Sequence, residues 1–92
     1  MKPLYFDDYL KEQLKDAEFK KIWDEGEAEY QAGAALIQAR IEKKLSQRQL
    51  AKKAKTTQAV ISRIERMSVS PSVGLLQKLA LAMGKRLKIK FA

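Results

Sequence analysis

The stretch from Leu45 to Met67, LSQRQLAKKAKTTQAVISRIERM, decides the fold of this chain. It predicts two short amphipathic helices joined by a tight turn. Ser46 is a good N-cap for the first helix, because its hydroxyl oxygen accepts a hydrogen bond from an unpaired N–H at the helix start. Thr56 or Thr57 can cap the second helix in the same way. Apolar residues at helical spacing give each helix one face to bury: Leu50, Ala51 and Ala54 in the first, and Val60, Ile61 and Ile64 in the second.

The opposite face of the second helix carries hydroxyl, amide and guanidinium groups. Such groups can bind base edges in the major groove of DNA, where Gln suits adenine and Arg suits guanine. A recognition helix needs this combination of an apolar stripe that anchors it and polar groups near its N-terminus that point outward. The polar face consists of Thr57, Gln58, Ser62, Arg63 and Arg66.

Residues 33 to 84 resemble the helix-turn-helix of the Xre/lambda-repressor-like DNA-binding family. The shared features are Arg40, Leu45-Ser46-Gln47, Leu50-Ala51, Thr56-Thr57-Gln58, Ile61-Ser62-Arg63-Ile64-Glu65, Pro71-Ser72 and Leu79-Ala80-Leu81-Ala82-Met83-Gly84. The resemblance implies an all-α, lambda-repressor-like helix-turn-helix bundle that binds double-stranded operator DNA. Because one recognition helix spans only a few base pairs, we expect a homodimer on a near-palindromic site.

The resemblance also implies roles for particular residues. It implies a phosphate contact for Gln47 and a buried ion pair between Arg40 and Glu65 that orients the motif. Five further cations are candidates for phosphate contacts: Lys43, Arg48, Lys52, Lys55 and Arg66. The positions that match the base-facing residues of the family are Thr57, Gln58, Ala59, Ser62 and Arg63.

Two positions depart from the family pattern. The family usually has Gly at the turn between the two helices and often another Gly after the recognition helix. Here these positions hold Lys55 and Met67. A residue other than Gly holds a positive φ at a cost of about 1 kcal/mol, so we expect slightly reshaped turns between intact apolar faces.

Composition narrows the function further. The 92 residues include no Cys and no His, which removes disulfides, the commonest general base and the commonest transition-metal ligands. The basic part holds no cluster of carboxylates, so we expect no enzyme and no cofactor or metal. The longest apolar run is Leu79 to Met83, whereas a membrane span needs about 20 residues. The N-terminus lacks the apolar core of a signal peptide, so we expect a cytoplasmic protein.

Charge is distributed unevenly along the chain. Residues 1–32 hold five Lys against nine Asp and Glu, a net charge of −4, while residues 33–92 hold fourteen Lys and Arg against two Glu, a net charge of +12. Because phosphate is attracted to positive charge, DNA should meet residues 33–92. Lysines that only solubilise a small domain are the alternative.

Three regions follow from these patterns. Residues 1–32 form an acidic helical arm, with one helix starting at Asp7 or Asp8 and a second capped by Asp16. Gly33 is the expected boundary, and residues 33–84 form the helix-turn-helix domain with its first helix from Ala34 to Lys44. Residues 85–92 form a short β-strand, because apolar and basic residues alternate there. A lone strand is not stable, so it either adds to a partner's sheet or, as we expect, pairs with its counterpart across a dimer.

The arm carries a second resemblance. The stretch YLKEQLKDAEFKKIWDEGEAEYQAGAALIQAR, residues 9–40, is similar to HigA-type antitoxins of bacterial toxin–antitoxin pairs. This resemblance implies that the protein masks a small basic toxin of the RelE fold that cleaves mRNA, and that it represses their shared promoter. Apolar anchors for the toxin would be Phe19, Ile22, Trp23 and Tyr30. Two alternatives stay open: these side chains only pack onto their own core, or the protein is a phage-type repressor without a toxin.

Overall fold

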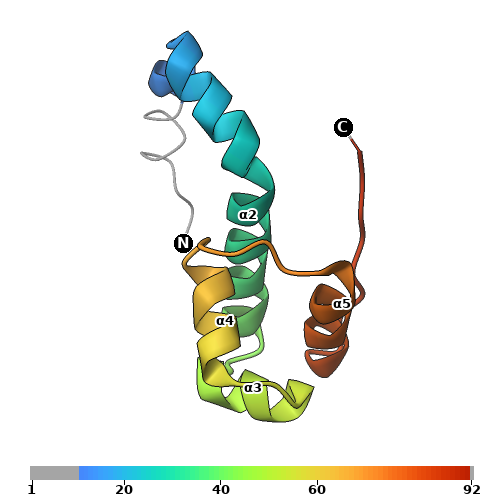
Figure 1. Ribbon diagram of the computed structural model, residues 1–92. Coiled ribbons are helices and arrows are strands. Elements are labelled where there is room, and N and C mark those ends of the chain that lie inside the picture. The colour runs from blue at the N-terminus through green and yellow to red at the C-terminus, as the bar shows by residue number, and fades with distance from the viewer. Residues whose placement is uncertain (1–10, 92) are drawn as a thin grey trace.

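The computed structural model describes residues 11–91 and shows an arrangement of helices (Figure 1). The helices are α2 (Ala17–Glu42), α3 (Gln47–Ala54), α4 (Gln58–Glu65) and α5 (Val73–Ala82). Residues 11–13 are also helical, and the expected helix start at Asp7 or Asp8 lies outside the described residues. The prediction of an all-α helix-turn-helix bundle is therefore confirmed.

The C-terminal strand is absent from the described chain, since residues 85–91 have no regular secondary structure. A β-strand exists only when its backbone is paired with another strand, and residues 11–91 contain no second strand that could pair with it. The alternating pattern of residues 85–91 therefore does not produce a strand within one described chain.

Helix α2 is the longest element, and it corrects one prediction. Asp16 caps it as expected, since its carboxylate accepts hydrogen bonds from the backbone N–H groups of Glu18 and Phe19 at 2.9 and 3.0 Å. The helix then passes without a break through Gly33, so the prediction that a separate helix begins at Ala34 is wrong. Gly33 weakens a helix by about 1 kcal/mol relative to Ala, but here it is buried against α4. A β-carbon at Gly33 would lie 2.7 Å from the backbone oxygen of Ile64, so close packing requires glycine.

Helices α3 and α4 begin at the caps that the sequence predicts. Ser46 accepts a hydrogen bond from the N–H of Gln49 at 3.0 Å, and the Gln49 side chain accepts one from the N–H of Ser46 at 2.8 Å. This reciprocal pair is a capping box, which satisfies two N–H groups at the helix start. For α4 the cap is Thr57, whose hydroxyl accepts from the N–H of Val60 at 3.2 Å.

Each of the four helices α2 to α5 ends in the same hydrogen-bonding motif. At the end of α4, the N–H of Ser68 donates to the carbonyl of Arg63 at 3.1 Å, and the N–H of Met67 donates to the carbonyl of Ile64 at 2.9 Å. This Schellman motif satisfies the last carbonyls and requires a left-handed residue just after the helix. The left-handed residues have φ values of 56° to 67°, and they are Lys44, Lys55, Met67 and Gly84. Lys55 and Met67 thus adopt the positive φ of the glycines they replace, and Lys44 does so unexpectedly.

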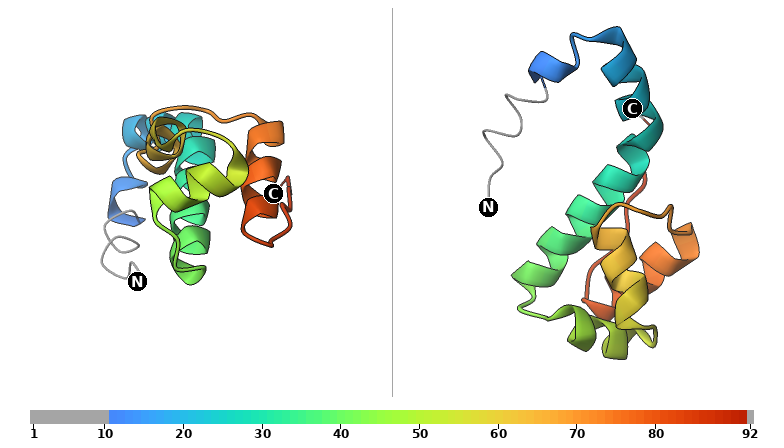
Figure 2. Two further views of the ribbon diagram at one scale, coloured as in Figure 1. Left: turned by 90° about the horizontal axis from the view of Figure 1, so that it is seen from below. Right: turned by 60° about the vertical axis from the view of Figure 1, so that its left-hand side comes forward.

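The helices enclose one small apolar core, while the N-terminal half of α2 projects beyond it (Figures 1 and 2). The fully buried large side chains of this core are Leu50, Ile61, Ile64 and Leu79.

Ser72 caps α5 through a hydrogen bond from the N–H of Leu75 at 3.0 Å. Among the described helices, none is both long enough and apolar enough to cross a bilayer.

Candidate nucleic-acid interface

Helix α4 has one side in the core and one side in solvent. Ile61, Ile64 and Glu65 are buried, and they fix the rotation of the helix about its axis. On the outward side, Ser62 is half-buried, and the other side chains predicted to face bases are exposed. The structure therefore gathers on one accessible helix surface Thr57, Gln58, Ala59, Ser62 and Arg63.

Gln47 links this surface to the interior. Its Nε2 donates to Glu65 Oε1 at 2.9 Å, and its Oε1 accepts from Gln58 Nε2 at 3.4 Å. The second hydrogen bond is long, so it orients Gln58 weakly and leaves that amide able to turn toward a base. Gln47 was predicted only as a phosphate ligand. The sequence had no signal for its bond to Glu65, because the two residues are 18 positions apart.

Arg40 and Glu65 join α2 to α4 through two hydrogen bonds, from Nε to Oε2 at 2.7 Å and from a terminal guanidinium nitrogen to Oε1 at 2.9 Å. The other terminal nitrogen donates to the carbonyl of Leu45 at 2.8 Å, which adds the α2–α3 turn to the network. The hydrogen bond to Glu65 raises the pKa of Arg40 above its ordinary value, against the opposing effect of burial. With Gln47 of α3 also bound to Glu65, one carboxylate holds three helices in register.

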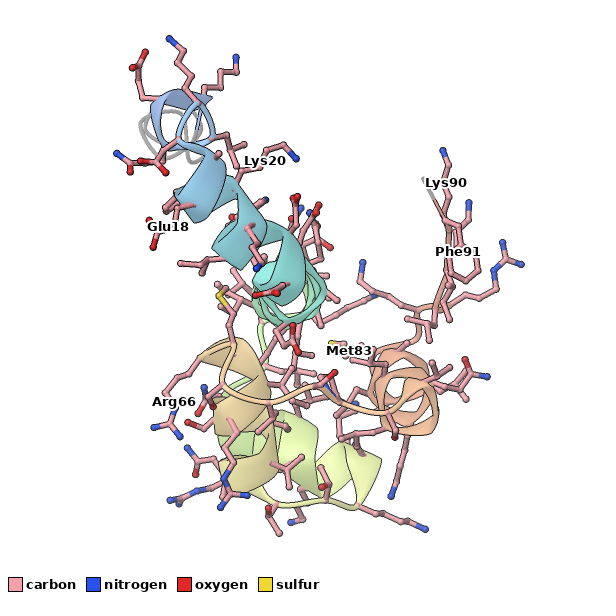
Figure 3. The ribbon with its side chains drawn as sticks, turned by 45° about the horizontal axis from the view of Figure 1, so that its top comes forward. Glu18, Lys20, Arg66, Met83, Lys90 and Phe91 are labelled. Atoms are coloured by element: carbon pink, nitrogen blue, oxygen red, sulfur yellow. The ribbon has the colours of Figure 1, made fainter. Side chains whose placement is uncertain are left out.

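The cations predicted to bind phosphate fall into two groups. Arg48 and Lys52 are exposed on α3, Lys55 and Arg66 are exposed just after α3 and α4, and Figure 3 shows Arg66 pointing away from the bundle. Lys43 is also exposed, but it lines a hollow of about 320 Å³ together with Lys53 and the end of α5, and no residue of α4 lines that hollow. The phosphate contacts remain predictions for all five.

Ser68 belongs to the same region, although no motif in the sequence pointed to it. Its hydroxyl donates to the carbonyl of Arg63 at 3.1 Å, alongside its own backbone N–H. The end of α4 is therefore held by two hydrogen bonds to one carbonyl. That carbonyl belongs to Arg63, which is itself predicted to read bases. In the sequence Ser68 is only a Ser three residues beyond the end of a helix, which is too common to identify such a role.

Comparison with known proteins agrees with this geometry. The helix-turn-helix family HTH_3 matches residues 36–89, which is more than half of the chain. No curated protein matches the chain, and no solved structure matches it. The matched range contains α3, α4 and α5 together with the end of α2, so it includes every residue of the network around Glu65. The chain therefore belongs to the Xre-like helix-turn-helix family of DNA-binding regulators.

Proposed function

We propose that this protein is a dimeric antitoxin that binds a specific operator, represses its own operon and neutralises a toxin of the RelE fold that cleaves mRNA. One observation carries the proposal. The continuous helix α2 carries an acidic, aromatic segment in its N-terminal half and forms part of the DNA-binding bundle in its C-terminal half. Helix α2 therefore joins an acidic segment to the basic bundle, and two regions of opposite charge suit two different partners.

The basic surface suits operator DNA. The +12 charge of residues 33–92 attracts phosphate regardless of base sequence, and binding of this kind weakens steeply as salt rises. Specificity must come from the exposed face of α4, where Gln58 and Arg63 can each form a bidentate pair with a base. Each such pair contributes about 1–3 kcal/mol of discrimination. Two recognition helices in a homodimer would read two half-sites about one helical turn apart.

The acidic surface suits a basic protein partner. The charge of −4 on residues 1–32 complements the RNA-binding face of a ribonuclease and would speed association with it. Ile22 is 62% exposed and is the most accessible of the four proposed anchors. Phe19, Trp23 and Tyr30 are half-buried. The Trp23 and Tyr30 rings contact each other with centroids 5.0 Å apart, so part of their surface is used within α2.

Selection from a random duplex DNA library tests the DNA-binding half of the proposal. The purified protein is used at about physiological salt, where weak attraction to phosphate is screened. We expect enrichment of an inverted repeat with half-sites about one turn apart. Binding that shows no sequence preference and disappears as salt rises would contradict a specific operator.

The toxin-binding half is tested with a matched pair of variants. The native complex is isolated, its small basic component is assayed for mRNA cleavage, and increasing amounts of antitoxin are added. Ile22→Glu should weaken inhibition of cleavage at least tenfold, because it places a charge in an apolar contact. Ile41→Glu is the control, since Ile41 lies on the same helix with nearly equal exposure, 61%, but in the bundle half. If both variants lose inhibition equally, the arm does not form the toxin site. If the protein selects a specific operator but no toxin is found with it, its function is that of a stand-alone repressor.

A further inference from the structure

The C-terminal segment, Lys85 to Phe91, starts at a fixed point and then leaves the bundle. The N–H of Lys85 donates to the carbonyl of Ala80 at 2.9 Å, and its Nζ binds Glu42 Oε1 at 2.8 Å. Beyond Lys85, no residue of the segment makes a backbone hydrogen bond within the described chain. Phe91 is 96% exposed, and Figure 3 shows it with Lys90 at the free end of the segment. The segment therefore presents unpaired N–H and C=O groups to a partner.

The side chains of this segment have a self-complementary order. Leu87, Ile89 and Phe91 alternate with Lys88 and Lys90, so the pattern reads apolar, Lys, Ile, Lys, apolar in both directions. Antiparallel pairing of two identical strands places each sequence opposite its own reverse. A pattern that is symmetric about Ile89 therefore puts apolar side chains opposite apolar ones when two copies pair there.

An apolar groove lies beside the start of the segment. Its volume is about 270 Å³, and Leu87 forms part of one wall. Helix α2 contributes Ala32, Ala35 and Ala39, whose small side chains leave the groove open. Leu76 of α5 also lines it, and so do Lys85, Arg86 and Lys88 of the segment. Nothing in residues 11–91 fills this space, while the large apolar side chains of Ile89 and Phe91 stand in solvent, 62% and 96% exposed.

We infer that the groove receives Phe91 of a second copy, in an antiparallel strand pair centred on Ile89. In this register Ile89 lies opposite the partner's Ile89, and Leu87 lies opposite the partner's Phe91, which brings that ring to the groove. The inference rests on the proposed homodimer and specifies its contact. The argument for a second copy is that the order of residues 87–91 is symmetric about Ile89, so two copies of the segment can pair with apolar side chains opposite apolar ones.

Charge gives this pairing a distinctive salt dependence. The same register places Lys88 opposite the partner's Lys90 twice, once on each side of the centre. Like charges directly opposite each other destabilise a strand pair, and salt screens that repulsion. Dimerisation should therefore strengthen as salt rises, whereas DNA binding weakens.

Single-cysteine cross-linking of the full chain tests the register, because the protein has no cysteine of its own. Directly opposed residues of antiparallel strands have Cα atoms about 4.5–5.5 Å apart, within the range of a disulfide. Under mild oxidation Ile89→Cys should give the most cross-linked dimer. Lys88→Cys and Lys90→Cys are the controls, since neither residue faces itself. Preferential cross-linking of Lys88→Cys would mean a pair centred on Lys88, with the register shifted by two residues, and would overturn the inference.

Sedimentation of the same chain tests the groove and the salt effect. Phe91→Ala should raise the dimer dissociation constant by roughly tenfold or more, while Ile22→Ala, another exposed apolar position, should leave it unchanged. Dimers that persist in Phe91→Ala, or that weaken as salt rises, would overturn the inference and leave the homodimer standing. A protein that stays monomeric at all concentrations would contradict both the inference and the proposed homodimer. Neither experiment contains DNA or toxin, so either result is separate from the operator and neutralisation tests.

Discussion

Arg40 and Glu65 bind each other across the α2–α4 contact with little access to water, since their side chains are 17% and 6% exposed. Removing one member of such a pair leaves the other charge buried without its counter-charge, which costs about 3–5 kcal/mol. We therefore expect Arg40→Met to lower the free energy of unfolding by an amount in that range, measured by urea denaturation followed by circular dichroism.

The double variant is the control for this pair. Arg40→Met combined with Glu65→Leu removes both charges and leaves apolar groups of similar size. The double variant should be more stable than Arg40→Met alone and should regain helical signal if the single variant does not fold. Destabilisations that simply add would show that the two side chains act independently.

Two glycines of α2 should respond in opposite directions to the same substitution. Gly26→Ala should raise the free energy of unfolding by about 0.5–1 kcal/mol, because Ala favours helix and an added β-carbon meets nothing within 4 Å. Gly33→Ala should lower it, because its β-carbon would meet the Ile64 carbonyl and the Met67 side chain, both at 2.7 Å. Thermal unfolding of both variants gives the comparison, and a stabilising Gly33→Ala would contradict the close α2–α4 packing.

Lys55 holds a left-handed conformation that glycine adopts without strain. Its φ of 57° leads us to expect that Lys55→Gly raises the free energy of unfolding by about 1 kcal/mol. Lys52→Gly is the matched control: this lysine is exposed within α3, so glycine there should destabilise by about the same amount. Chemical denaturation measures the free energy of unfolding of the two variants. If Lys55→Gly is destabilised as much as Lys52→Gly, the turn is not strained.

Acid should remove the contact between Glu42 and Lys85. The hydrogen bond from Lys85 is the main cause that lowers the pKa of Glu42 below its ordinary value of 4.5, with the charge of Lys85 next. A carboxylate with a lowered pKa in the folded state stabilises the fold above its unfolded pKa, and that contribution disappears as pH falls through the lowered value. Wild type should therefore exceed Glu42→Gln in stability at pH 7 and lose that difference below about pH 4. A difference that does not change between pH 7 and pH 3 would contradict the contact.

Arg63→Ala should weaken operator binding while leaving the fold unchanged. The binding free energy should fall by about 1–3 kcal/mol if Arg63 pairs bidentately with guanine, and discrimination at that one position should relax. Arg66→Ala is the comparison: because it removes a cation predicted to bind phosphate, it should weaken binding to all sequences alike and reduce the salt dependence. Fluorescence anisotropy on operator and scrambled duplexes measures the DNA affinity of both variants. Reduced helicity in Arg63→Ala would mean that Arg63 stabilises the fold instead of reading bases.

Local chemistry explains which structural predictions succeeded. Asp16, Ser46 and Thr57 cap helices by bonding N–H groups two or three residues away, so their role is visible in a short window of sequence. The break expected at Gly33 was wrong because helix propensity is a local quantity, whereas the contact with Ile64 that stabilises a continuous α2 comes from a distant part of the chain. The same distance hid the bond between Gln47 and Glu65.

By itself, the sequence determined the helical class, the capped starts of α2, α3 and α4, the apolar faces of the helix-turn-helix and the separation of acidic from basic charge. Each of these depends on neighbours within a few residues or on composition alone. Only the tertiary structure decided that α2 is one helix, that Glu65 joins Arg40 to Gln47, and that a groove opens between the alanines of α2 and the C-terminal segment. These features depend on which distant residues meet, and that is settled by packing rather than by local preference.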